Sequence, residues 1–186
     1  MKRSIIAIAL LLPACAESSP DDEEDSPPTL EQRLDELAEC EPTDLEMLLP
    51  WMGPAFDPMT GQLLAPLPAG HVEAVVNGWR RYDEESTRLR MEQGAAVAGD
   101  VFARDGLLGF SSVESVECDI SISHTLWRDE ASMFAFVLGD AHAYAMSRAH
   151  EMHFEAAGAH WDGEARDTPP TWREGIDRMV QELRAE

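Results

Sequence analysis

Lysine is almost absent from this sequence, and its absence excludes several kinds of chemistry. Lys2 is the only lysine, and the chain carries 14 basic against 36 acidic residues, for a formal net charge of −22. Because no lysine follows Lys2, the chain has neither a phosphate-binding P-loop nor a Schiff-base lysine. A chain this acidic is also repelled by nucleic-acid backbones and by anionic lipid head groups. We therefore expect no nucleic-acid partner.

Other sequence patterns of catalysis are missing too. The chain has no Gly-x-Ser-x-Gly elbow, no haem-attachment Cys-x-x-Cys-His and no calcium loop with alternating Asp or Asn ligands. His150-Glu151-Met152-His153 has one residue between Glu and the second His, whereas the zinc-protease motif needs two. A Ser/His/Asp site assembled from distant residues stays open, because its members need not be near in sequence.

Long hydrophobic runs are missing as well. An apolar run from Ser4 to Leu12 follows Lys2 and Arg3. It is well short of the roughly 20 residues that span a bilayer. A basic start followed by a short apolar core is typical of a secretory signal. We therefore expect the protein to be exported.

Leu12-Pro13-Ala14-Cys15 resembles the lipobox of bacterial lipoproteins. The resemblance implies that residues 1–14 are a signal peptide and that Cys15 carries a diacylglyceryl group. It places the protein in the bacterial cell envelope, with the membrane as a partner through the N-terminal lipid. Ala16, where inner-membrane lipoproteins often have Asp, favours the outer membrane. The alternative is an ordinary secretory signal cleaved after Ala14.

Residues 15–28 hold the lipidated cysteine and an acidic stretch rich in Ser and Pro, which predicts a disordered tether. Residues 29–186 are then a single globular domain. Cys40 and Cys118 are its two cysteines, and export favours a disulfide between them. Closing a loop of that length would contribute about 4 kcal/mol in the chain-entropy model. Two buried free thiols are the alternative.

Helix signals recur along the domain. Thr29 with Gln32, and Thr171 with Glu174, have the spacing of capping boxes before amphipathic runs. Residues 50–70 hold five Pro and three Gly and predict a long irregular loop. The expected helices cover 29–40, 43–49, 71–93 and the segment from 172 onward.

Strand signals lie between these helices. Asp105-Gly106 separates two apolar runs and predicts a hairpin, and residues 116–123 alternate like a half-buried strand. Residues 129–157 fit either a helix or a hairpin, and their Ala and Met content favours the helix. The predicted class is α+β, helix-rich, with several amphipathic helices and a small antiparallel sheet. The alternative is a larger antiparallel β-meander over 99–148 packed by helices.

Histidines are concentrated near the C-terminal end, with four of six between His142 and His160. On a helix, Met146, His150 and His153 have the spacing i, i+4, i+7 and could share one zinc or copper ion. His160, Asp162 or a group from another helix could complete the ligands. His142 would lie roughly 16 Å from His153, too far to join. The alternative is that these histidines edge the core and that the protein has no cofactor.

These observations favour a lipid-anchored envelope protein with a non-enzymatic binding or structural role, for which a protein partner is a candidate. A metal-binding lipoprotein using the His142–His160 region is the second hypothesis. A hydrolase with a spatially assembled site is the third.

Overall fold

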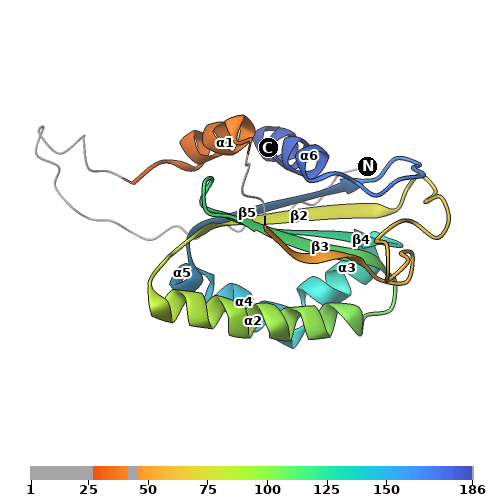
Figure 1. Ribbon diagram of the computed structural model, residues 1–186, viewed down its shortest axis with the longest axis horizontal. Helices are drawn as coiled ribbons and strands as arrows, with labels where there is room; N and C mark the ends of the chain where they lie inside the picture. Colours follow the sequence, from red (N-terminus) through yellow and green to blue (C-terminus); the bar gives the residue numbers. More distant parts are fainter. Residues whose placement is uncertain (1–26, 42–45, 186) are drawn as a thin grey trace, which may run out of the picture.

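The computed structural model describes residues 27–41 and 46–185, which form an antiparallel sheet with helices on both faces (Figure 1). The five strands have the spatial order β1-β3-β4-β2-β5. In chain order the elements are α1 (Leu30–Glu39), β1 (Glu46–Met52), β2 (Val72–Arg80), α2 (Glu84–Phe102), β3 (Leu107–Ser115), β4 (Ile120–Trp127), α3 (Glu130–Val137), α4 (Asp140–Ser147), α5 (Ala149–Met152), β5 (His153–Asp162) and α6 (Trp172–Arg184). The α+β class predicted from the sequence is confirmed, and the alternative meander over 99–148 is not what forms.

The sheet separates two helical layers. Helices α1 and α6 cover one face, and α2 to α5 lie along the other (Figure 1). Side chains alternate between faces along a strand, so residues paired across strands point to the same side. We call the side under α1 and α6 the closed face and the side under α2 to α5 the open face, for reasons given below.

The closed face carries the larger apolar core. Leu34 and Leu37 of α1, and Ile176 and Met179 of α6, form one apolar cluster with Val75 of β2, a strand that lies between β4 and β5. Both helices begin at the predicted capping boxes, in which Thr29 and Thr171 accept backbone N–H groups that would otherwise be unpaired. The predictions of these two helices are therefore confirmed.

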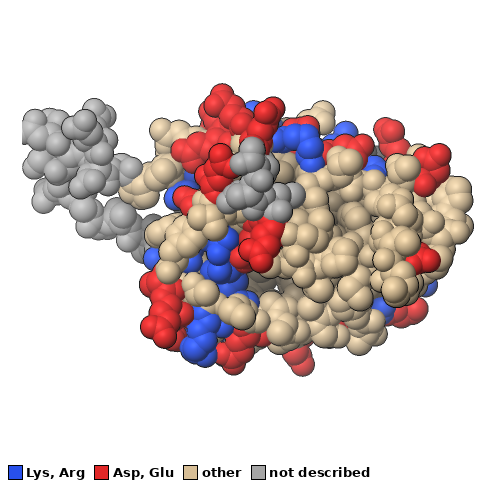
Figure 2. Space-filling view, in the orientation of Figure 1, with Lys and Arg blue, Asp and Glu red and all other residues tan. Residues whose placement is uncertain are grey.

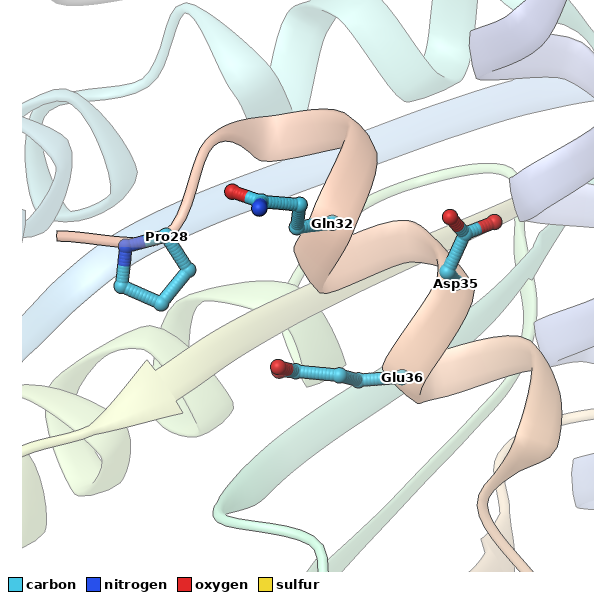
Figure 3. Close-up of a pocket in the computed structure, with 4 residues that line it drawn as sticks. All are labelled: Pro28, Gln32, Asp35 and Glu36. Atoms are coloured by element: carbon cyan, nitrogen blue, oxygen red, sulfur yellow. The ribbon is translucent and has the colours of Figure 1, made fainter. Parts of the chain in front are cut away.

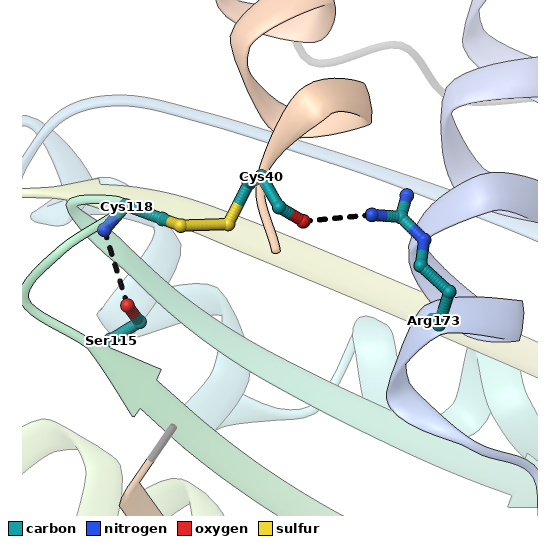
Figure 4. Close-up of a disulfide and its surroundings, with 4 residues drawn as sticks. All are labelled: Cys40, Ser115, Cys118 and Arg173. Atoms are coloured by element: carbon teal, nitrogen blue, oxygen red, sulfur yellow. Dashed lines mark hydrogen bonds between the residues drawn. A yellow bond between two sulfur atoms is a disulfide. The ribbon is translucent and has the colours of Figure 1, made fainter. Parts of the chain in front are cut away.

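A disulfide fastens α1 to the turn between β3 and β4 (Figure 4). Cys40 caps α1 and bonds Cys118, with 6.1 Å between their Cα atoms. The guanidinium of Arg173 on α6 donates to the Cys40 carbonyl, and the Cys118 N–H donates to the Ser115 hydroxyl. The predicted disulfide is confirmed, and it ties both helices of the closed face to the sheet.

The predicted helix over 71–93 is wrong in its first half. Residues Val72–Arg80 form β2, which pairs with β4 on one side and β5 on the other, and α2 begins after its N-cap Asp83. A strand buried on both faces carries apolar residues in both directions, and over a short run that pattern is hard to distinguish from a helix.

The predicted helix over 43–49 is also wrong where the structure describes it. Residues Glu46–Met52 form β1, and residues 42–45 lie outside the described residues. Strand β1 pairs only with β3, so it is an edge strand, where Pro50 is tolerated. The strand expected over 116–123 starts later, at Ile120, after a turn in which Asp119 has a positive φ of 56°.

The segment 129–157 is helical only as far as Met152. Gly139 is the N-cap of α4, Arg148 separates α4 from α5, and β5 starts at His153. At Asp105-Gly106 the predicted turn exists, with Gly106 at φ +86°, but it joins α2 to β3 instead of joining two strands. Tertiary pairing of β5 with β2 overrides the helical preference of its first residues.

Among the described residues, no helix has the length and apolar character needed to cross a membrane.

Candidate functional site

The centre of the open face is not sealed by the helices above it. Strand pairing places Ser112, Ser123, Val76 and Gly158 in one row across β3, β4, β2 and β5. Val76 belongs to a central strand and faces the helical layer, yet it is 37 % exposed. The other three residues of the row are partly exposed as well. Solvent-sized molecules therefore reach the middle of the sheet on this side.

This row is also chemically unlike a packed core. A sheet face under helices is normally apolar, whereas Ser112, Ser121 and Ser123 place three hydroxyls there. These hydroxyls neither make a hydrogen bond to another described group nor count among the buried unsatisfied atoms. We call these three serines with Val76 and Gly158 the serine floor. Helix α4 packs chiefly against α2 and not closely on any strand, which leaves the floor uncovered.

One end of the serine floor is aromatic. Phe134 of α3 meets the His160 ring edge to face, with 5.6 Å between ring centroids, and Phe136 stacks on Trp127. The Nε2 atom of His160 lies 3.4 Å from the Glu130 carboxylate. This end offers an apolar contact surface with one imidazole beside it.

The opposite end carries a charged cluster. The Glu114 carboxylate on β3 lies 3.1 Å from the Arg80 guanidinium on β2 and 3.0 Å from that of Arg90 on α2. Arg90 also donates to the Arg81 carbonyl. Because Arg90 descends from the helix to the sheet, this cluster joins the two layers and closes that end of the floor.

His153 lies beside this cluster. Its ring lies over Gly78, where a Cβ atom would come within 2.3 Å of the imidazole, so only glycine leaves room for the ring. Burial lowers the pKa of His153 to about 4, and the positive charge of Arg90 adds to the shift. His153 is therefore a neutral imidazole at physiological pH, able to exchange a hydrogen bond with a bound molecule.

The structure disperses the residues predicted to bind metal. Met146 lies on α4 and His150 is exposed on α5, whereas His153 and His160 belong to β5. The i, i+4, i+7 spacing behind that prediction is absent because the helix ends at Met152. His153 and His160 are seven residues apart in a strand, roughly 23 Å, too far to share an ion. The described residues contain no group of three or more His, Cys, Asp or Glu able to hold a metal ion.

His142, the remaining histidine of that region, faces the helical layer. Its Nδ1 atom lies 3.1 Å from the Val137 carbonyl, and its ring meets Phe136 edge to face. Burial lowers its pKa, so it too is neutral. His142 therefore lies at the edge of the core, as the alternative interpretation of the histidines predicted.

The closed face has its own polar group, and it is sealed. Glu73 is only 2 % exposed, and its carboxylate lies 3.1 Å from His71, 3.4 Å from His124 and 3.4 Å from Arg166. His124 is enclosed by three indoles, with ring centroids at 5.0 to 6.2 Å, from Trp51, Trp161 and Trp172. No substrate can reach this group without opening the core.

The protonation states of this group follow from its contacts. The Nδ1 atom of His71 donates to the Pro68 carbonyl and its Nε2 atom to Glu73, so both nitrogens carry hydrogen and the ring is a cation. Burial alone would lower the pKa of His71, but these partners raise it. Burial would raise the pKa of Glu73, but the two histidines and Arg166 lower it to about 2. For His124 burial dominates and lowers the pKa, so it stays neutral.

A shallow depression at the start of α1 is lined by Pro28, Gln32, Asp35 and Glu36 (Figure 3). Gln32 is already engaged in the capping box with Thr29. The two carboxylates are exposed on the helix, and no residue at the depression has an unusual environment. We therefore do not regard it as a functional site.

Comparisons with known proteins identify the fold but not a family. No family model matches the chain, and no curated protein matches it. A Fusobacterium nucleatum protein described as a candidate monooxygenase has a similar structure, with TM-score 0.51, 7 % identity and coverage of 69 % of this chain and 55 % of that one. The chain thus spans about half the length of that protein.

Two smaller proteins align less well. SnoaB, a cofactor-independent oxygenase from Streptomyces nogalater, has TM-score 0.42 and 13 % identity, with 55 % of this chain and 100 % of that one covered. A protein of unknown function from Nitrosomonas europaea has TM-score 0.45 and 15 % identity, with 54 % of this chain and 96 % of that one covered.

The structural comparison corrects the function predicted from the sequence. A non-enzymatic binding or structural role was expected, but the chain shares its α+β fold with a protein described as a candidate monooxygenase. The correction extends to the two alternatives, a metal-binding lipoprotein and a hydrolase. Sequence patterns missed the serine floor because its members come from separate strands, and only the strand register brings Ser112 next to Ser123.

Proposed function

We propose that the protein is an enzyme whose small-molecule substrate binds between the serine floor and helices α2 and α4. One observation carries the proposal: Val76, on a central strand under a helical layer, is 37 % exposed among hydroxyls that have no described protein partner. Accessible polar groups beside apolar side chains, on a sheet face that helices partly cover, are typical of ligand sites. A purely structural layer would carry apolar side chains at the three serine positions.

The surroundings of the floor suit a molecule with an aromatic or otherwise apolar body. Phe134 and Val76 offer apolar contact, and the serine hydroxyls can fix polar substituents. The neutral His153 can accept or donate a hydrogen bond at the other end. Because proteins of similar fold are described as monooxygenases, oxygenation of an electron-rich aromatic is the first reaction to test.

The test compares two tryptophan substitutions. Val76→Trp fills the space above the floor, whereas Met91→Trp adds the same ring on α2 at a residue that is strongly exposed. Oxygen uptake with a panel of phenols and hydroxynaphthalenes, and their binding by fluorescence titration, would be measured for both variants and the wild type. We expect Val76→Trp to abolish binding and uptake and Met91→Trp to retain both. Equal behaviour of the two folded variants would contradict the proposal.

We also propose that the protein is anchored through a lipid on Cys15. The supporting observation is the lipobox-like sequence before it, and residues 1–26 lie outside the described residues. The disulfide between Cys40 and Cys118 agrees with an exported protein. Wild-type protein should partition into detergent, and Cys15→Ser should be released or left unprocessed. Wild-type protein free in the aqueous fraction and cleaved elsewhere would contradict the anchor.

A further inference from the structure

The charged cluster at one end of the serine floor is unbalanced. A single carboxylate, Glu114, faces the two guanidiniums of Arg80 and Arg90. The arginine side chains are 10 % exposed and the glutamate 15 %, so bulk water screens them little. The Nε atom of Arg80 is buried and has no hydrogen-bond partner among the described groups. Buried donors of this kind are costly unless something accepts from them.

The cluster reaches onto the floor itself. Arg80 and Glu114 stand on strands separated by β4, so the arginine side chain crosses β4 to reach the carboxylate. Ser121 is the β4 residue directly opposite Glu114, and its hydroxyl is not engaged by another described group. A molecule lying on the serine floor would therefore meet guanidinium and hydroxyl donors together at this end.

Among the residues that the structure describes, Arg80 and Arg90 form their ion pairs with the same carboxylate, that of Glu114. Glu46 pairs with Glu114 on the edge strand, and Asp119 accepts the Tyr82 hydroxyl, but both acids are exposed and screened. Arg81 adds positive charge nearby and donates to two backbone carbonyls, while His153 is neutral. Figure 2 shows basic and acidic side chains intermixed at the end of the molecule where α2 begins, whereas the opposite end of that view carries fewer charged side chains.

We infer that the substrate carries an anionic group, a carboxylate or a similarly placed oxyanion, which docks on Arg80, Arg90 and Ser121 while its apolar body extends over Val76 toward Phe134. This inference rests on the proposed function and specifies the substrate class of the same site. Arginine suits the role because its planar donors match a carboxylate in a bidentate arrangement. Val76 and Arg80 are four residues apart on β2, roughly 13 Å. The His153 ring lies over Gly78 between them, so the substrate would pass beside this ring, along Ser123 and Ser121 of β4.

The experiment uses two probes of the same shape. Binding of 1-naphthoate and of the neutral 1-naphthamide would be measured by calorimetry on the purified protein at neutral pH and low salt. We expect the acid to bind about tenfold or more tightly, which is the typical gain from one charge-assisted hydrogen bond. Raising the salt concentration should weaken the binding of naphthoate and leave the binding of naphthamide unchanged.

Removing the competing carboxylate of Glu114 gives the most direct test of the inference. Glu114→Gln frees both guanidiniums, so we expect this variant to bind naphthoate several-fold more tightly than the wild type. If the cluster only held the two layers together, disrupting it would weaken naphthoate binding. Glu85→Gln, on the exposed surface of α2, is the matched control and should change nothing. If Glu114→Gln does not fold, Ser121→Ala serves instead and should weaken naphthoate while leaving naphthamide unchanged.

The outcomes separate this inference from the proposed function. Naphthamide binding as tightly as naphthoate, with both blocked by Val76→Trp, would overturn the anion inference and leave the small-molecule site standing. Failure of both probes to bind the wild type would count against both. Weaker naphthoate binding in folded Glu114→Gln would also overturn the inference.

Discussion

The polar side chains on the two faces of the sheet differ in burial and in pairing. On the closed face, Glu73 is surrounded by His71, His124 and Arg166 and sealed under indole rings. On the open face, the hydroxyls of the serine floor are accessible and have no described partner. Buried charges that are mutually paired hold a structure together, whereas accessible unpaired groups remain available for a ligand. Stability and binding are thus assigned to different sides of the same five strands.

The same strand residues show the division. Val75 and Val76 are neighbours on β2, yet Val75 is fully buried against α6 and Val76 is open toward α4. The closed face is held by a disulfide, two capped helices and a continuous apolar cluster. The open face has apolar packing at the α3 end and an ionic bridge at the other, with the floor between. Perturbing each face should therefore affect different measurements.

The largest effect on stability should come from Glu73→Gln. The change leaves the cationic His71 and Arg166 without their carboxylate in the core, and breaking a buried ionic group in this way costs about 3 to 5 kcal/mol. Urea unfolding would measure the loss, with the exposed Glu85→Gln as a control that should behave like the wild type. A Glu73→Gln variant as stable as the wild type would show that the closed face does not depend on this group.

Removing the disulfide should cost nearly as much. Replacing Cys40 and Cys118 by Ser frees a loop with a sequence separation of 78 residues. The chain-entropy model gives a loss of about 4 kcal/mol. Because the bridge joins α1 to the β3–β4 turn and contacts none of the residues of the serine floor, ligand binding to the folded fraction should be unchanged. A binding defect larger than the unfolded fraction explains would mean that the faces are coupled.

The open face should make stability depend on pH. The pKa of His153 is about 4 in the folded protein and near 6.5 when unfolded, so the unfolded chain binds more protons between these values. Stability should therefore fall as the pH drops from 6.5 to 4, by at most about 3 kcal/mol from this residue. His153→Gln should flatten that slope, and the exposed His150→Gln should not. Equal slopes in both variants would remove His153 as the cause.

Glu73 and His71 affect stability in other pH ranges. The stabilisation from Glu73, whose pKa is lowered to about 2, is present above pH 4.5 and is lost as the pH falls from 4.5 toward 2. The contribution of His71, whose pKa is raised, is present below pH 6.5 and is lost as the pH rises through its folded pKa. Burial also lowers the pKa values of His124 and His142, so the difference between the His153→Gln and His150→Gln slopes measures the share of His153 alone.

The smallest effect should be a gain in stability. Asn77 is fully buried on the closed face, and neither its amide oxygen nor its nitrogen has a hydrogen-bond partner among the described residues. Asn77→Leu has a similar shape and removes both unsatisfied atoms, so we expect stabilisation by about 1 to 2 kcal/mol. Thermal and urea unfolding would measure it. Destabilisation would show that the amide is satisfied inside the core.

The sequence predicted the closed face better than the open one. Helices α1 and α6 and the disulfide follow from local signals: capping residues, one apolar stripe per helix, and two cysteines in an exported chain. Strand β2 escaped prediction because it is buried between β4 and β5, and its apolar residues at Val72, Val75 and Trp79 also fit a helical spacing. Its identity depends on partners that lie far away in the sequence.

The open face depends almost wholly on such distant partners. Ser121 and Ser123 alternate with Ile120 and Ile122, a pattern that predicts a solvent-facing side without showing that helices lie above it. Ser112 joins them only through the strand register, and Arg90 only through the placement of α2. The helical spacing on which the metal prediction depended does not form, because β5 begins at His153, in the middle of the histidine series.

The central claim is that small molecules reach the sheet on one face and not on the other. We would place single cysteines at the neighbouring positions Val75→Cys and Val76→Cys, in a chain that also carries Cys15→Ser and keeps its native disulfide. Alkylation by iodoacetamide would be timed under native conditions, with and without 1-naphthoate. We expect rapid labelling at position 76, slowed by naphthoate, and labelling at position 75 no faster than unfolding. Equally slow labelling at both positions would show that the open face is as sealed as the closed one.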